Sequence, residues 1–72
     1  MKTLADYTFV VTPDEGVWLA YVPAIAGCHA MGDSPEEARR ELEGVFSLFV
    51  QDYAQSAESM PPDVKELVAV AG

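Results

Sequence analysis

The chain has 72 residues, half of them hydrophobic, and a formal net charge of −8 from twelve acidic and four basic residues. This length corresponds to one small domain, near the lower limit for folding around a single core. A strongly acidic surface repels phosphate backbones, which argues against direct nucleic-acid binding. The charge favours a basic partner or, as an alternative, simply keeps a small domain soluble.

The cysteine count and the hydropathy pattern bear on location. A single cysteine excludes an internal disulfide and fits a reducing compartment. No segment reaches the roughly 18 apolar residues of a membrane span, and the first residues, "MKTLADYTF", lack the features of a signal peptide. We therefore expect a cytoplasmic protein.

Two strands and a turn are predicted first along the chain. "YTFVVT" (7–12) and "VWLAYV" (17–22) are rich in aromatic and β-branched residues and predict a β-hairpin. The turn between them is "PDEG", where Pro13 presets φ and Gly16 can adopt a positive φ. Both strands are fairly apolar on both faces, which indicates a sheet covered by a helix on one side and by a second chain on the other.

A short strand and a long helix follow. "CHAM" (28–31) predicts the third strand. Ser34 as N-cap, Pro35 as first helical residue and Glu37 at the third position predict a capping box. Apolar residues then recur at helical spacing over about 20 residues, with Gly44 costing about 1 kcal/mol relative to Ala. The apolar positions are Ala38, Leu42, Val45, Phe46, Phe49, Val50 and Tyr53.

The tail completes the predicted fold. Pro61 and Pro62 end the helix, and "ELVAVAG" predicts a fourth strand, although a short helix within residues 63–72 stays an alternative. The resulting order β-β-β-α-β describes a two-layer α+β domain with three antiparallel strands and one long helix. A crossover would place the last strand parallel to the first. We expect a single domain over residues 1–72.

The adjacent pair Cys28 and His29 is the most reactive-looking feature of the sequence. Neighbours on a strand point to opposite faces, which denies the two side chains hydrogen-bond contact. A lone cysteine is usually a small buried hydrophobe, and an enzyme that uses Cys28 remains the less favoured alternative. A metal site needs about four ligands, so one His and one Cys would need ligands from other copies in an oligomer.

The carboxylates give no catalytic constellation either. Asp33, Glu36, Glu37 and Glu41 crowd the predicted helix start, where capping and the helix dipole explain most of them. The first and fourth predicted strands contain no acid, which argues against a two-metal nuclease. No phosphate-binding Gly-rich loop or nucleophile elbow occurs. We expect no enzyme, no catalytic residue, no metal and no cofactor.

Self-association is predicted from the layer count. One helix covers only one face of a sheet, so the other face is left as an exposed apolar patch that a second copy can cover. We expect Val10, Trp18 and Val22 to contribute to this contact in a homo-oligomer, either a dimer or a tetramer.

The order of these segments resembles the HicB-like antitoxin family of type II toxin–antitoxin systems. The resemblance rests on "YTFVVTPDEGVWLAYVPAIAGC", "GDSPEEA" and "SMPPD", which together span about residues 7–62. It implies a partial ribonuclease-H-like domain without the nuclease carboxylates. It also implies a partner, because family members neutralise HicA toxins, which are small basic ribonucleases that cut messenger RNA.

The resemblance leads to specific expectations for this chain. We expect a non-enzymatic domain whose contacts to a basic toxin come from the loop and the helix start: Ile25, His29, Glu36, Glu37 and Glu41. The alternative is a solitary self-assembling module of the same fold with no toxin partner. Two departures from the family stand out. The loop reads Pro-Ala-Ile-Ala where the family has Pro-Asp-Leu-Pro, and we expect no C-terminal DNA-binding domain within residues 1–72.

Overall fold

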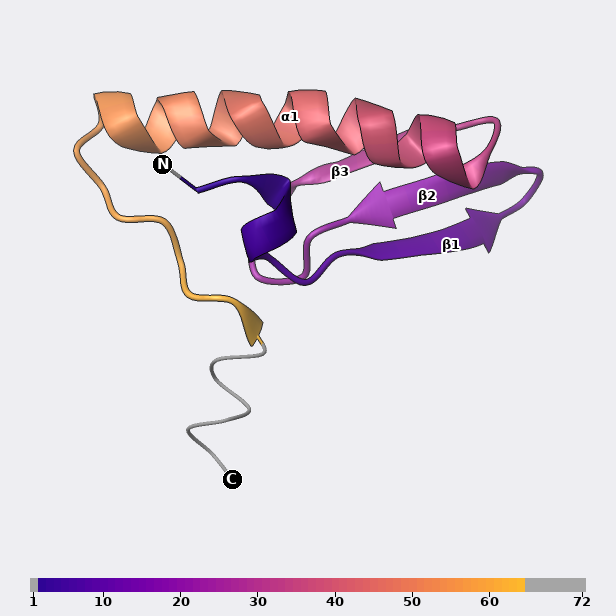
Figure 1. Cartoon of the computed structure of the whole chain (residues 1–72), viewed down its shortest axis with the longest axis horizontal. Helices are drawn as coiled ribbons and strands as arrows, with labels where there is room; N and C mark the ends of the chain where they lie inside the picture. The colour runs from indigo at the N-terminus through magenta and orange to yellow at the C-terminus, as the bar shows by residue number, and fades with distance from the viewer. Residues whose placement is uncertain (1, 65–72) are drawn as a thin grey trace.

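The computed structural model describes residues 2–64, which form one helix packed on one side of a three-stranded sheet (Figure 1). The strands β1 (Val10–Asp14), β2 (Val17–Tyr21) and β3 (His29–Gly32) pair antiparallel in the order β1-β2-β3. A short 3-10 helix, η1 (Leu4–Asp6), precedes them, and the long helix α1 (Pro35–Gln55) follows. The predicted α+β class with three antiparallel strands and one long helix is confirmed. The fourth predicted strand, "ELVAVAG" (66–72), lies outside the described residues.

The hairpin turn is tighter than the sequence indicates. Glu15 and Gly16 form a two-residue turn with φ values of 48° and 90°. Positive φ at both central residues matches the twist of the flanking strands. Pro13 therefore lies inside β1, opposite Trp18, rather than in the turn. Proline is tolerated there because β1 is an edge strand.

The start of α1 shows the Ser34 half of the predicted capping box. Ser34 is the N-cap, and its Oγ accepts a hydrogen bond from the backbone N–H of Glu37 at 3.1 Å. Pro35 begins the helix, where its missing N–H leaves no hydrogen bond unmade. Gly32, at the end of β3, lies so close that a Cβ there would be 2.5 Å from the backbone nitrogen of Ala38. This contact fixes how tightly the helix start packs on the sheet.

The two chain segments outside the sheet and helix are tied to each other. The carboxylate of Asp63 accepts hydrogen bonds from the backbone N–H and the hydroxyl of Thr8, at 3.0 and 2.8 Å. The Tyr7 hydroxyl donates to the carbonyl of Pro61. The chain after α1 is thus fastened to the entrance of β1. Because of these contacts and η1, the first strand begins at Val10 and not at Tyr7.

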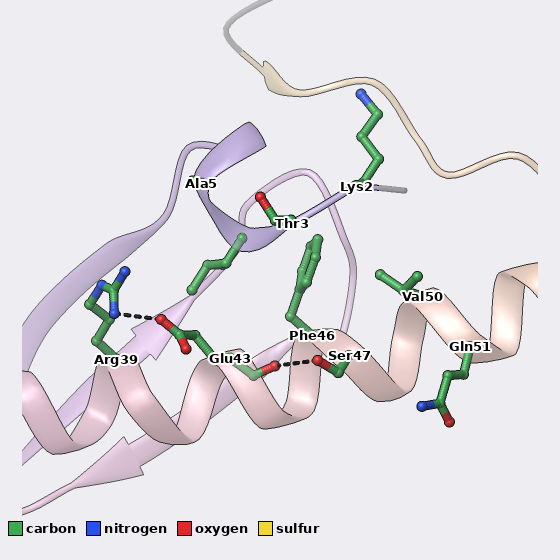
Figure 2. Close-up of a pocket in the computed structure, with 10 residues that line it drawn as sticks. Lys2, Thr3, Ala5, Arg39, Glu43, Phe46, Ser47, Val50 and Gln51 are labelled. Atoms are coloured by element: carbon green, nitrogen blue, oxygen red, sulfur yellow. Dashed lines mark hydrogen bonds and ion pairs between the residues drawn. The ribbon is translucent and has the colours of Figure 1, made fainter.

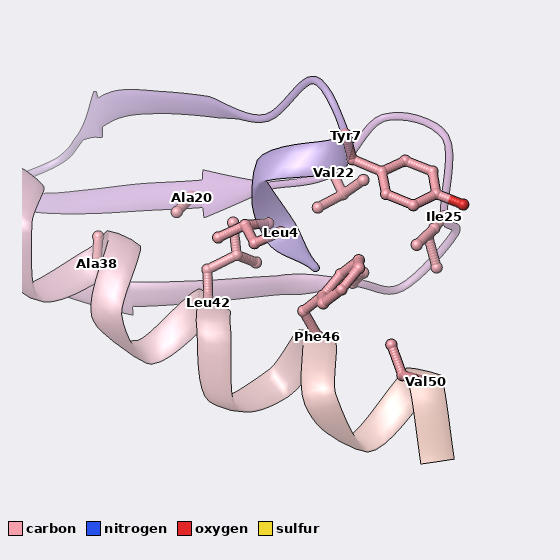
Figure 3. Packing of buried hydrophobic residues seen from close by; sticks show 10 residues of the cluster. Leu4, Tyr7, Ala20, Val22, Ile25, Ala38, Leu42, Phe46 and Val50 are labelled. Atoms are coloured by element: carbon pink, nitrogen blue, oxygen red, sulfur yellow. The ribbon is translucent and has the colours of Figure 1, made fainter. Parts of the chain in front are cut away.

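The core lies between α1 and the sheet and is closed at one end by η1 (Figure 3). Tyr7 and Phe46 meet edge to face, with ring centroids 5.6 Å apart. The buried hydrophobic residues come from η1, β2, α1 and the segments next to η1 and β2: Leu4, Tyr7, Ala20, Val22, Ile25, Cys28, Ala38, Leu42, Phe46 and Val50.

The strand register assigns each strand residue to a face. Val11, Ala20 and Ala30 form one row across the three strands, and Ala20 is fully buried under the helix. Alternation then places Val10, Thr12, Asp14, Val17, Leu19, Tyr21, His29 and Met31 on the opposite side, which we call the outer face.

Two of the three residues predicted for self-association lie on the helix side instead. Val22 is 2% exposed and belongs to the core, and Trp18 packs against it. Only Val10 is on the outer face. Val10 is paired with Tyr21, so its neighbours on that face are the odd-numbered residues of β2.

Candidate interaction surfaces

The Cys28–His29 pair does not form a catalytic arrangement. Cys28 is 2% exposed, and burial raises the pKa of its thiol above the ordinary value. Its backbone N–H donates to the Ile25 carbonyl, and its carbonyl accepts from Val22, so the residue closes the β2–β3 loop. His29 is exposed on the other side of the strand. The predicted opposite orientation of the two side chains is confirmed. A buried thiol with a raised pKa has the properties of a structural cysteine.

The described part of the chain contains neither a cluster of metal ligands nor a membrane-spanning helix. Within residues 2–64, no three His, Cys, Asp or Glu side chains are grouped closely enough to hold a metal ion. No helix in the same range combines the length and hydrophobicity required to cross a bilayer.

The predicted partner-binding residues divide into buried and exposed ones. Ile25 is 2% exposed and packs in the core, so its prediction as a surface contact is wrong. The loop folds inward because the Ile25 N–H donates to Val22 and its carbonyl accepts from Cys28. His29, Glu36 and Glu41 are exposed, and Glu37 is half-buried. His29 is on the outer face of the sheet and the glutamates are on α1, so the structure does not gather them into one patch.

One side of α1 carries a more continuous surface. Glu37, Glu41, Leu48 and Asp52 are spaced by four, seven and four residues, which places them along the same side of a helix. We call this set the acidic flank. Leu48 is 65% exposed, one of the largest exposed hydrophobic side chains of the described chain. Gly44 lies between the two ends of the flank, and a Cβ there would meet nothing within 4 Å.

The sequence reading missed Leu48 and Asp52 as surface candidates. The helical spacing of apolar residues predicts only the buried positions of the helix, and Leu48 is not one of them. Its spacing from Glu41 is the signal that could have placed it on the acidic side.

The opposite side of α1 faces η1 across a groove of about 410 Å³ (Figure 2). Arg39 pairs with Glu43 along this side, and its guanidinium lies 5.8 Å from the centroid of the Phe9 ring. Lys2 lies 5.4 Å from the Tyr7 ring centroid. The exposed ion pair contributes only a few tenths of a kcal/mol. Because Arg39 is engaged on this side, it does not neutralise the acidic flank.

The comparisons with known proteins give two similar chains. UPF0150 protein Ta0767 of Thermoplasma acidophilum is 29% identical over 65 residues, which cover 89% of this chain and 94% of that protein. UPF0150 protein ssr1765 of Synechocystis sp. is 25% identical over 63 residues, covering 86% of this chain and 80% of that one. The relatives of this chain are UPF0150 proteins. Their names state a family and no activity. No family model matches the chain, and no solved structure does.

Proposed function

We propose that this chain is a non-enzymatic protein-interaction domain of the HicB antitoxin type, which binds a small basic ribonuclease of the HicA type. The observation that carries the proposal is the acidic flank of α1. It combines three carboxylates with one exposed leucine, and the helix as a whole holds five acidic and two basic residues. A basic protein would pair with the carboxylates and cover Leu48.

The chemistry of the rest of the chain supports binding over catalysis. The cysteine is buried with a raised pKa, and the histidine is exposed on the other face of β3. The three carboxylates of the acidic flank are spread along α1 and Glu43 pairs with Arg39 on the opposite side, whereas a carboxylate pair serving a reaction would converge on one point. The order of segments that resembles HicB-like antitoxins is consistent with a partner-covering role.

The first test is whether the neighbouring reading frame encodes a small basic protein, and the second is whether a catalytically inactive variant of that protein binds this chain. In titration calorimetry, the affinity should fall steeply as salt is raised, because exposed charges are screened. Reversing Glu41 and Asp52 together to lysine should raise the Kd by roughly tenfold, a loss of about 1.4 kcal/mol.

A matched control separates the flank from the net charge. Asp14 is exposed on the outer face of β1 and Glu58 is exposed after α1, so Asp14→Lys combined with Glu58→Lys changes the total charge by the same amount as the flank reversal. Two such changes outside the flank should alter the affinity far less. An affinity that ignores both salt and the flank reversal would contradict the electrostatic contact.

The uncovered outer face of the sheet favours a second candidate. In this alternative the chain is a self-assembling module of the same fold, and its partner is another copy.

A further inference from the structure

The outer face is a contiguous surface that nothing in the described chain covers. Figure 1 shows α1 along one side of the sheet only. The central row across this face is Thr12, Leu19 and Met31, and Met31 is 56% exposed. The neighbouring row is Val10, Tyr21 and His29. Val10, Leu19 and Tyr21 remain partly exposed, since their side chains point away from the helix.

The distribution of charged residues indicates which kind of partner binds the outer face. The two rows contain no Asp, Glu, Lys or Arg, although the chain carries twelve acids. Asp14 lies at the hairpin end, and five acids lie on α1, in the other layer. On the outer face, a basic protein would find the carboxylate of Asp14 at the hairpin end and no other acid of the three strands, and a nucleic acid would find no lysine or arginine. A surface of the same uncharged, apolar kind is complementary to it, and a second copy presents that surface.

We infer that two copies of this chain stack outer face against outer face about a twofold axis. The dimer has four layers, with the two α1 helices on the outside. A twofold contact uses the same patch on both copies, so Leu19 lies near its centre and faces its own symmetry mate or Met31. This inference rests on the self-assembly candidate and not on the basic partner.

Repulsion between two acidic chains does not prevent this arrangement. Packed layers are about 10 Å apart, so the two helices would lie roughly 30 Å from each other. The Debye length is about 8 Å at physiological ionic strength, and charges at such a separation are largely screened. Stacking through the helices would instead bring both sets of acids into contact.

The area of the outer face indicates how much surface a dimer would bury. Three strands of about five residues make a surface of roughly 14 by 17 Å. Protruding side chains make the accessible area larger than this flat area. Two such faces would bury on the order of 1,000 Å² in total, which is at the low end for specific contacts. Contacts of this size are typical of weak association, and we expect a dimer Kd on the order of micromolar.

The experiment is sedimentation equilibrium of the full chain from about 5 to 300 µM, with Leu19→Lys as the variant. The wild type should pass from monomer to dimer over this range, and Leu19→Lys should stay monomeric. Met31→Lys gives a second variant in case the first does not fold, and far-UV circular dichroism checks both. Leu48→Lys is the matched control, because it places the same charge on an exposed apolar residue of α1 and should leave the dimer unchanged.

Salt distinguishes this contact from the one with a basic protein. Raising the salt should strengthen the dimer, since it screens the repulsion between like-charged copies, whereas it should weaken binding of the basic protein. A wild type that stays monomeric at 300 µM would overturn the self-assembly candidate together with this inference. A dimer that persists in both lysine variants would overturn the outer face as the interface and leave self-assembly standing.

Discussion

Gly32 and Gly44 offer a test of how the helix is held on the sheet. Both are glycines to which a Cβ could be added, but their surroundings differ. A Cβ at Gly32 would lie 2.5 Å from the backbone nitrogen of Ala38 and 2.9 Å from the carbonyl carbon of Glu37. A Cβ at Gly44 would have nothing within 4 Å. Gly32→Ala should therefore destabilise the fold, and Gly44→Ala should stabilise it.

The magnitudes follow from the contacts. An ordinary carbon contact is about 3.5 Å, so alanine at position 32 requires the start of α1 to move by roughly 1 Å. Overpacking of this kind costs about 1–3 kcal/mol, and the backbone nitrogen of a helix cannot turn aside as a side chain can. We expect a net loss of about 2 kcal/mol. Alanine in place of glycine in the middle of a helix gains about 1 kcal/mol.

The assay is urea unfolding followed by far-UV circular dichroism and by Trp18 fluorescence. Near the midpoint, about 1 kcal/mol corresponds to 4–8 °C in Tm for a domain of this size, so thermal scans should resolve both changes. All three proteins are compared at one chain concentration, because dimerisation would make the midpoint depend on concentration. Equal midpoints for Gly32→Ala and the wild type would refute the close approach of β3 and α1.

Three other changes test single contacts. Ser34→Ala removes the helix cap and should cost about 1 kcal/mol in urea unfolding, whereas Ser34→Asp should retain most of it. Asp63→Ala removes the acceptor of the Thr8 backbone N–H and hydroxyl. Because Thr8 is exposed and water can replace the acceptor, the variant should lose about 1 kcal/mol, and the Thr8 amide should exchange faster with solvent. Burial raises the pKa of Cys28, so the folded state keeps the proton longer than the unfolded state. The wild type should therefore lose stability as the pH rises through the ordinary thiol value of about 8.5, and Cys28→Ala should lack this part of the pH dependence.

The parts of the fold that the sequence predicted correctly depend on local chemistry. The hairpin follows from two β-rich segments around a glycine that can adopt positive φ. The helix start follows from the serine, proline and glutamate at fixed spacing, and the structure places Ser34 as the N-cap. The opposite orientation of Cys28 and His29 was predicted from strand alternation, although β3 begins at His29 and Cys28 lies at the end of the preceding loop. Each of these needs only neighbours within a few residues.

The parts that were missed depend on contacts between distant segments. The face of Trp18 and Val22 is set by which residue of β1 lies opposite which residue of β2, and a shift of one residue exchanges the faces. Ile25 is buried because its loop folds back between Val22 and Cys28. Asp63 accepts a hydrogen bond from Thr8, which is 55 residues away in the sequence, and no local sequence pattern predicts that contact.

The corrected faces also change the functional argument. If Trp18 and Val22 were exposed, the apolar patch would be aromatic and the core would lose two of its larger members. With both packed inward, the outer face is left with smaller and more flexible groups, chiefly Leu19 and Met31, around Tyr21. The carboxylates of the acidic flank are in the other layer, on α1. Apart from Asp14 at the hairpin end, the acids of the strands and of α1 thus lie away from the outer face, so a basic protein on α1 and a second copy on the outer face would not compete for one site. A dimer formed through the outer face would present two acidic flanks on opposite sides, and two basic proteins could bind to it at once.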